Sequence, residues 1–261
     1  MVKTLVLYDK IYSLYKEKDL KDVSLRFLKY LNELTQSFSS TKIRIKKIRK
    51  YDNRVEVLIS GPEEIFIFNM LRKQVGTITE FDEVKVGDVY RGTMLDVGKV
   101  GFGIFIDCAI FNPNVDVLLN LYDLRSQLCN SRSVPLTEII TTYDFIDTFP
   151  IFVRITSINT EKEQIQGILD QKTLDLYNKL VKENLEAVFL SGETKGQLKK
   201  ALLKTGHLRD IVSIERYGFL KNIVILRENT TAPGIISDIG KYLKKCKLSA
   251  IRPERIKKLY L

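Results

Sequence analysis

The sequence is poor in the side chains that metal-dependent and acid–base enzymes usually cluster. Among its 261 residues there is no tryptophan, one histidine and three cysteines. The single histidine, His207, excludes a histidine cluster, and its place after a predicted helix is typical of a capping or surface residue. Cys108, Cys129 and Cys246 are too few and too scattered for a disulfide framework or a zinc site. Their odd number agrees with a reducing compartment.

Long apolar runs are missing as well. No segment approaches the ~20 uninterrupted apolar residues that a membrane-spanning helix needs. The opening MVKTLVLYDK lacks the apolar core and the cleavage site of a signal peptide. We therefore expect a cytoplasmic protein with no membrane partner. A hydrophobic content of 44% is enough for two or three small cores.

Sequence motifs of catalysis are also absent. The glycines of GKVGFG do not fit GxGxxG and open no helix, and SGETKGQL at 191–198 lacks the Gly-Lys-Ser/Thr ending of a phosphate loop. The carboxylates of the central segment have no spacing typical of a metal-dependent nuclease; they are Asp88, Asp96, Asp107 and Asp116. We therefore predict a non-enzymatic protein with no catalytic residue, no metal and no cofactor.

Positive charge is plentiful, and it is unevenly distributed. The net charge of +10 divides into +6 for residues 1–81, −6 for 82–170 and +10 for 171–261. Residues 42–54 hold seven basic side chains and one acidic, and 241–261 hold eight and one. Such clusters favour a polyanionic partner, because phosphate contacts by Lys and Arg release condensed counterions. A solvated basic face is the alternative.

The first third has the pattern of a βαββα unit. Apolar spacing and turn residues predict a strand at 4–8, a helix over 23–38, strands at 42–51 and 54–60, and a helix from Pro62 to about Val75. In the first strand of the hairpin, alternation places Ile43 and Ile45 on one face. The other face is then basic, with Lys42, Arg44 and Lys46.

The last third repeats this order. The expected elements are a strand at 186–190, a helix over 198–205, strands at 210–217 and 222–228, and a helix from Pro233 to Cys246. We interpret the two flanks as related units around an inserted domain. The alternative is that the two flanks are unrelated and that three elements occur in the same order by chance.

The central segment, 82–170, is rich in β-branched and aromatic residues, and glycines interrupt its short strands. Its opening, KVGDVYRGTMLDVGKVGFGIFID, resembles the RNA-binding OB domain named after ribosomal protein S-one. The family's VGD turn and its Phe-Gly-x-Phe segment match residues 86–88 and 102–105. VDVLLNLYDL at 115–124 and FVRITSINTEKEQIQGIL at 152–169 are similar to the family's later strands. The resemblance implies a five-stranded OB-fold barrel.

This resemblance also implies an RNA site. Bases would stack on Phe102 and Phe105, although the two are three residues apart and one of them can instead be a core residue. Asn120 stands in place of the family's histidine and is a further candidate, while Gln164 and Asn159 replace charged residues. Phosphate contacts would come from four cations of this segment: Lys85, Arg91, Lys99 and Arg154. Alternatively, the acidic barrel docks onto a basic ribosomal protein.

The C-terminal segment SAIRPERIKKLYL is basic, and Pro253 interrupts any helix that continues from Tyr242. We expect this tail to become ordered on its partner, with Ile256, Leu259 and Tyr260 filling an apolar recess there. Phosphates would meet its cations, Arg252, Arg255, Lys257 and Lys258. The alternative is that the apolar residues pack back on the protein's own second βαββα unit.

The prediction is an α+β multidomain chain in which a central five-stranded OB-fold β-barrel, 82–170, is flanked by βαββα domains at 1–81 and 171–261. Its predicted function is RNA binding as a ribosome-associated factor of the translation apparatus. Ribosomal RNA and ribosomal proteins are the expected partners. An accessory subunit of an RNA-processing or degradation complex is the first alternative, and an enzyme with a site between the repeats is the second. The whole chain also resembles an archaeal family that carries such an OB domain, which implies an archaeal source.

Overall fold

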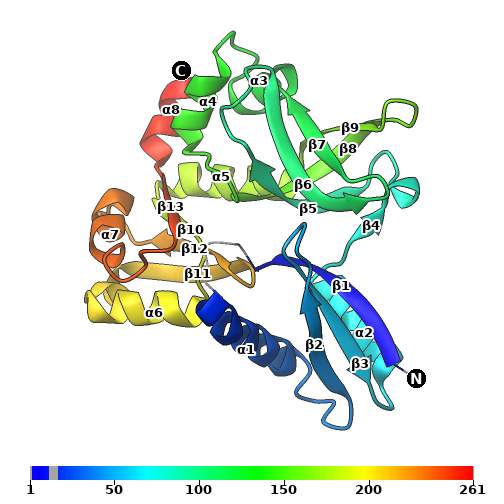
Figure 1. Cartoon of the computed structure of the whole chain (residues 1–261). Helices are drawn as coiled ribbons and strands as arrows, with labels where there is room; N and C mark the ends of the chain where they lie inside the picture. Colours follow the sequence, from blue (N-terminus) through cyan, green and yellow to red (C-terminus); the bar gives the residue numbers. More distant parts are fainter. Residues whose placement is uncertain (1, 12–16, 261) are drawn as a thin grey trace. The chain divides into compact units, whose positions relative to one another are not determined.

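The computed structural model describes residues 2–11 and 17–260, and it contains two compact units, one ending at Ile78 and one beginning at Thr79 (Figure 1). The first unit has the predicted βαββα order. Its elements are β1 (Val2–Lys10), α1 (Glu17–Leu34), β2 (Lys42–Ile48), β3 (Arg54–Ser60) and α2 (Glu64–Gln74). The strands form an antiparallel sheet in the order β1-β3-β2, so β2 is an edge strand.

Strand alternation separates the two faces of this first sheet. Val57 and Ile59 of β3 are fully buried, as are Phe27 of α1 and Ile67 of α2, and both helices contact the sheet. The core of the unit therefore lies between the sheet and its helices. On β2, Lys42 and Arg44 point away from this core and are exposed, as predicted.

The second unit begins with a β-barrel. Its strands are β5 (Val89–Leu95), β6 (Gly103–Phe111), β7 (Val115–Asn120), β8 (Pro150–Asn159) and β9 (Gln164–Leu169). A short strand, β4 (Thr79–Glu80), pairs with β6 in parallel outside the ring, and a 3-10 turn, η1 (Phe81–Glu83), follows it. Strands β6-β5-β8-β9-β7 are hydrogen-bonded in that order, and pairing of β7 with β6 closes a five-stranded barrel. The β7–β9 pair is parallel and the barrel's other pairs are antiparallel. This confirms the predicted OB fold.

Two helices connect β7 to β8, namely α3 (Leu121–Leu128) and α4 (Leu136–Tyr143). After the barrel the chain forms α5 (Gln171–Glu183), β10 (Ala187–Ser191), α6 (Lys195–Lys204), η2 (His207–Asp210), β11 (Ile211–Gly218), β12 (Lys221–Leu226) and α7 (Ala232–Ile239). These elements include the predicted second βαββα order. The chain then adds β13 (Lys247–Ile251) and α8 (Pro253–Tyr260), so the sheet order is β11-β12-β10-β13.

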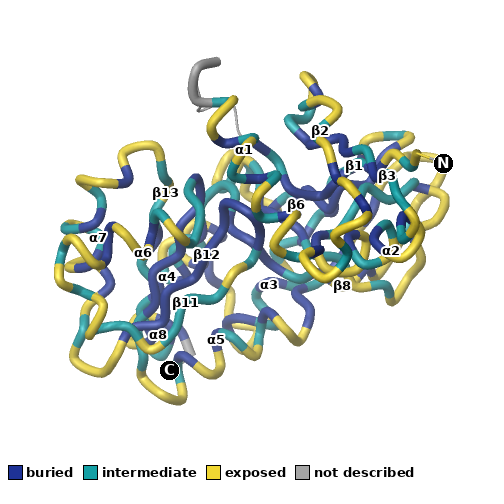
Figure 2. The backbone as a smooth tube through the Cα atoms, turned by 90° about the horizontal axis from the view of Figure 1, so that it is seen from below, coloured by how far each residue is buried: buried dark blue, intermediate teal, exposed yellow. Residues whose placement is uncertain are grey.

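The barrel and the second sheet share one hydrophobic core. Phe149 of the barrel and Phe189 of β10 lie with their ring centroids 4.6 Å apart, and both belong to one buried cluster. Figure 2 shows buried residues, in dark blue, along β12 in this unit. The opposite face of the sheet packs on α6 and α7 in a separate cluster. The division of the chain into three domains at 81/82 and 170/171 stays a prediction.

The expectation that the C-terminal tail becomes ordered on a partner was wrong, because the tail is ordered within the chain itself. Helix α8 contacts α4 and α5, and Ile256 is 1% exposed within the cluster that the barrel shares with the second sheet. The Leu259 carbonyl accepts a 2.8 Å hydrogen bond from Arg132. Pro253 starts α8 in place of ending a helix, because proline suits the first helical turn. The helix predicted over 233–246 ends at Ile239 instead.

Candidate nucleic-acid interface

A groove with a volume of about 430 Å³ opens on the outer side of the barrel. Strand β6, strand β7, strand β9 and the turn before β9 form its walls. The two aromatic residues predicted to stack with bases, Phe102 and Phe105, both line it. Their ring centroids are 6.1 Å apart and the rings are perpendicular. The structure therefore brings the predicted aromatic pair together.

The register of the barrel explains the groove floor. Phe105 of β6 lies opposite Leu118 of β7, and Leu118 lies beside Gln166 of β9. These three positions alternate with the buried positions of their strands, so their side chains leave the barrel interior. An aromatic ring, an aliphatic side chain and an amide thus form one row across three strands.

Phe102 reaches the same groove because it precedes β6 and is not bound by strand alternation. Its backbone carbonyl accepts a 2.8 Å hydrogen bond from the Leu121 amide at the start of α3. The next residue, Gly103, has no room for a side chain: a Cβ there would lie 2.3 Å from the Leu119 carbonyl oxygen. Phe102 is 55% exposed. Its ring is therefore accessible to a ligand without unfolding the barrel.

The rim of the groove is polar and close to neutral. Lys162 supplies a positive charge, while Glu163 and Asp116 supply negative ones. Gln164 and Gln166 add amide groups, which can both donate and accept hydrogen bonds. The sequence resemblance had singled out Gln164, but it missed Gln166, Leu118 and Lys162. Strand alternation over 115–120 and 164–169 could have identified Leu118 and Gln166, because it places both on the outer face of the barrel.

Asn120 has a structural task. Its side-chain oxygen accepts a 2.9 Å hydrogen bond from the Asp123 amide, which caps α3, and its side-chain nitrogen donates to the Asp123 carboxylate at 2.6 Å. It lies on β7 opposite Gly103 but does not line the groove. Its predicted role in RNA binding is not tested by this geometry and stays a prediction.

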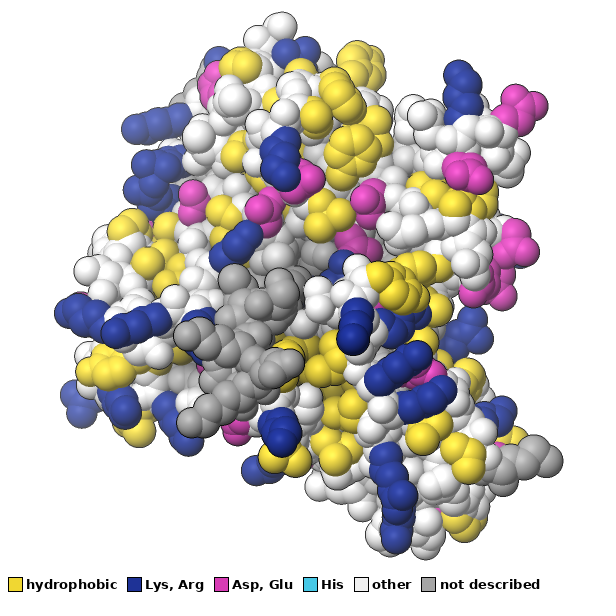
Figure 3. Space-filling view, in the orientation of Figure 1, with side chains coloured by type: hydrophobic (Ala, Val, Ile, Leu, Met, Phe, Trp, Pro, Cys, Tyr) yellow, Lys and Arg dark blue, Asp and Glu magenta, His cyan; other side chains and the backbone are white. Residues whose placement is uncertain are grey.

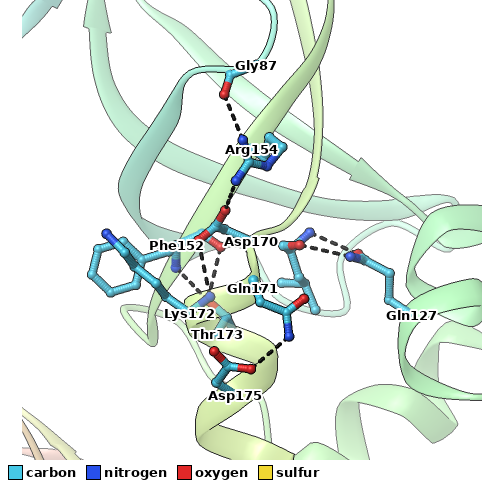
Figure 4. Close-up of polar contacts among 10 residues, drawn as sticks. Gly87, Gln127, Phe152, Arg154, Asp170, Gln171, Lys172, Thr173 and Asp175 are labelled. Carbon is cyan, nitrogen blue, oxygen red and sulfur yellow. Dashed lines mark hydrogen bonds and ion pairs between the residues drawn. The ribbon is translucent and has the colours of Figure 1, made fainter.

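Arg154 is held by its own chain at the junction of β8, the VGD turn and α5 (Figure 4). It donates to the Asp170 carboxylate at 2.7 Å and to the Gly87 carbonyl at 3.0 Å. Asp170 is buried, and it also caps α5 by accepting from the Lys172 amide. Thr173 adds a second link, since its hydroxyl exchanges hydrogen bonds with the backbone of Phe152 on β8.

The other predicted cations of the barrel do not line the groove either. Lys85 lies in the turn before β5, where its amide donates to Asp88, and Arg91 lies on β5 beside Phe152 of β8. Lys99 is exposed and pairs with Asp96 at 2.6 Å, and hydrogen bonding to that carboxylate raises the pKa of Lys99. The cations are thus spread around the barrel.

The three predicted basic residues of β2 differ in their surroundings. Lys42 and Arg44 are exposed on the face opposite the core. Lys46 lies at an irregularity in the strand and pairs with Glu56 of β3 at 2.7 Å, and Lys47 reaches the same carboxylate at 3.4 Å. The hydrogen bond from Lys46 lowers the pKa of Glu56. Part of the charge on this strand is therefore neutralised within the sheet.

The cations of the C-terminal segment lie on or beside α8. Arg255 and Lys258 are exposed and line a shallow depression beside α4. Lys257 donates to Asn184 at 2.6 Å and to Glu254 at 2.9 Å. Arg252 is partly buried just before the helix. Helix α8 presents Arg255 and Lys258 to solvent while its apolar side is buried.

Among residues 2–11 and 17–260 no cluster of histidine, cysteine and acidic side chains has a geometry that could hold a metal ion. In the same residues, no helix is both long enough and apolar enough to cross a membrane. His207 lies between two carboxylates, with Nδ1 2.7 Å from Asp210 and Nε2 2.9 Å from Asp238.

Parts of the chain resemble several solved structures. An uncharacterized protein of Methanocaldococcus jannaschii, MJ1198, matches 34% of this chain and 96% of its own, with 22% identity and a TM-score of 0.24. GSP13 from Bacillus subtilis matches 35% of this chain and 58% of its own, with 16% identity and a TM-score of 0.25. A chain of the a/eIF2alpha-aDim2p-rRNA complex from Pyrococcus horikoshii matches 49% of this chain and 70% of its own, with 14% identity and a TM-score of 0.26. At these TM-scores no functional conclusion follows.

No curated protein matches the chain. Two domain models of a single family do match it, and they follow each other along the sequence. Residues 75–180, which contain the barrel, match the DUF2110 central domain, and residues 185–251, which contain the second sheet, match the DUF2110 C-terminal domain. Through these two domains, which together span about two thirds of its residues, the chain belongs to the DUF2110 family.

Proposed function

We propose that this protein is a non-enzymatic RNA-binding protein that takes unpaired nucleotides of RNA into the groove on its barrel. The observation that supports this most is the pairing of Phe102 and Phe105 at the groove, with Phe102 more than half exposed. An accessible ring is a stacking platform for a base, and such a contact contributes ~1 to 3 kcal/mol. The barrel's S-one-like sequence pattern agrees with this role.

The composition of the groove favours an unpaired strand over a duplex. Gln164 and Gln166 can hydrogen-bond the Watson–Crick edge of a base, and that edge is reachable only where the base is not paired. Because Asp116 and Glu163 offset Lys162, the groove itself attracts phosphate weakly. Long-range attraction would come from basic surfaces elsewhere, including Lys42 and Arg44 on β2.

The direct test is Phe102→Ala in the full chain, with binding to a short single-stranded RNA measured by fluorescence anisotropy. We expect a loss of affinity of about 5- to 150-fold, which corresponds to the stacking range of ~1 to 3 kcal/mol. Tyr122→Ala is the matched control, because Tyr122 is 79% exposed on α3 and does not line the groove. Thermal unfolding of both variants should match that of the parent. Equal affinities for the parent and Phe102→Ala would reject the groove as the site.

We further infer that the bound RNA is ribosomal. The two basic flanks around an acidic barrel suit a surface where RNA and basic proteins adjoin. Co-sedimentation with ribosomal subunits at low and at high salt tests this. If the protein binds short RNA but stays in the supernatant at both salt concentrations, RNA binding is supported and binding to the ribosome is contradicted.

A further inference from the structure

Two neighbouring segments of the second unit carry only positive charge. Helix α6 (Lys195–Lys204) contains four lysines and no acidic residue. The segment 241–247, which follows α7, also contains four lysines and no acidic residue. Together they hold most of the positive surplus of the last third of the chain.

The fold brings these two segments into contact, and we call their exposed residues the lysine face: Lys199, Lys200, Lys204, Lys241, Lys244, Lys245 and Tyr242. The ammonium group of Lys204 lies 5.4 Å from the centroid of the Tyr242 ring. Leu202 of α6 and Leu243 belong to the same buried cluster beneath that surface. Figure 3 shows basic side chains gathered over α6 and near α7, at the lower left.

His207 links the end of α6 to α7 beside the lysine face. It follows α6, and its Nε2 lies 2.9 Å from a carboxylate oxygen of Asp238 on α7. The other carboxylate oxygen of Asp238 is 4.0 Å from Lys241. Asp238 therefore has His207 and Lys241 as partners at the edge of the lysine face.

An aromatic ring stands among these cations. Tyr242 is 53% exposed, and Leu203 of α6 is also exposed. A lysine surface that surrounds an exposed ring offers charge for phosphates and a flat apolar platform for a base. This combination distinguishes the lysine face from a solvated helix surface that carries charge alone.

The lysine face lies on the opposite side of the second sheet from the barrel. Phe189 of β10 points into the core shared with the barrel, whereas its neighbours Val188 and Leu190 point into the cluster under α6 and α7. A nucleotide in the groove therefore cannot touch the lysine face directly. Any contact there has to involve another part of the same RNA.

We propose that the lysine face is a second RNA-binding surface, where the lysines bind phosphates and one exposed base stacks on Tyr242. This inference rests on the proposed function of the groove. An RNA that is long enough to reach both surfaces gains affinity from the second contact at the effective concentration set by the first. A short RNA that fills only the groove gains nothing from it.

The experiment compares two full-chain variants against a short and a long single-stranded RNA. Lys199→Gln/Lys200→Gln removes two cations of the lysine face. Lys179→Gln/Lys182→Gln is the matched control, since it removes two exposed lysines from helix α5 of the same unit. Affinity is measured at several salt concentrations with the short RNA, which fits one OB domain, and with an RNA several times longer.

We expect the first variant to weaken binding of the long RNA and to reduce its salt slope by up to about 1.4, because each phosphate contact on a single strand contributes ~0.7. Binding of the short RNA should not change, and the control variant should behave like the parent. Tyr242→Ala should weaken binding of the long RNA and leave binding of the short RNA unchanged. Equal losses in the two lysine variants, or no loss in either, would overturn the inference.

Failure of the proposed function gives a different result. In that case the unmodified protein binds neither the short nor the long RNA. Competition separates RNA from an acidic protein partner: polyglutamate that displaces the long RNA from the lysine face as effectively as unlabelled RNA would contradict an RNA-binding surface.

Discussion

Arg154 and Asp170 form an ion pair, with 2.7 Å between the guanidinium nitrogen and the carboxylate oxygen, that ties β8 of the barrel to the start of α5. Asp170 is 3% exposed, and its carboxylate accepts hydrogen bonds from this partner and from the Lys172 amide. The sequence alone places Arg154 among the candidate phosphate contacts, whereas the structure gives it a second role at this junction.

Replacing Arg154 with alanine should therefore lower stability. A hydrogen bond to a charged group contributes about 1.5 to 3 kcal/mol, and we expect a loss toward the lower end because the Arg154 side chain is half exposed. Urea unfolding followed by circular dichroism measures this change. In Arg154→Ala/Asp170→Asn, which removes both charges, part of the loss should be recovered. An unchanged midpoint combined with weaker RNA binding would instead assign Arg154 to the RNA.

The glycines on either side of Phe102 should respond in opposite ways to substitution. A Cβ at Gly103 would lie 2.3 Å from the Leu119 carbonyl, whereas a Cβ at Gly101 would meet nothing within 4 Å. Gly103→Ala must therefore push β6 away from β7 and distort the groove, and we expect ~1 to 3 kcal/mol of destabilisation. Gly101→Ala should be close to neutral in thermal unfolding. Two equally stable variants would contradict this account of the groove wall.

The barrel and both βαββα orders could be predicted because their signals are local. Alternation, glycine breaks and helical spacing are visible within ten or twenty residues. Strand β13 was missed because its five residues become a strand by pairing with β10, far away in the sequence. Arg154 was predicted only as a phosphate contact for the same reason, since Asp170 is not a recognisable partner before β8 and α5 meet.

The roles of Phe102 and Phe105 could be predicted from the sequence only in part. Residue type and family resemblance identified the candidate stacking pair, but strand alternation left open that one of the two is a core residue. The structure resolves this because Phe102 lies outside β6. The capping role of Asn120 could also have been predicted, because asparagine is a preferred residue at the start of a helix.

Helix α8 should be a structural element of the second unit. Ile256→Ala removes a side chain that is 1% exposed in the core, and we expect a loss of about 2 to 5 kcal/mol. Lys258→Ala, two residues away in the same helix and exposed, is the control and should leave the midpoint of unfolding unchanged. Equal midpoints for the two variants would restore the view that this helix is ordered only by a partner.

Neighbouring cations of β2 should differ in their effect on RNA binding. Lys42→Gln/Arg44→Gln removes two exposed charges, which should lower the salt slope by up to about 1.4 on a single strand. Lys46→Gln should lower the slope less, because Lys46 already pairs with Glu56. Its cost to stability should be at most about 1 kcal/mol, since the lysine is half exposed. If the salt slope changes equally for each charge removed, the RNA must displace Glu56 from Lys46.

His207 should make the stability of the protein depend on pH above about pH 6.5. Hydrogen bonds first to Asp210 and then to Asp238 raise the pKa of His207 above its usual value of 6.5. A raised folded-state pKa means that the folded chain holds the proton more tightly than the unfolded chain. The stabilisation is therefore fully present below about pH 6.5, and it is lost as the pH rises through the folded-state pKa.

Two measurements check this prediction. Because the sequence contains one histidine, its ring proton resonance titrates alone in an NMR spectrum and gives the folded-state pKa directly. Urea unfolding from pH 6 to pH 9 then gives the loss of stability, which should be ~1.4 kcal/mol for each pH unit by which that pKa exceeds 6.5. His207→Gln keeps a hydrogen-bonding side chain but cannot titrate in this range, so its stability curve should be flatter. Parallel curves for the two proteins would mean that the Asp210–His207–Asp238 contacts do not couple protonation to folding.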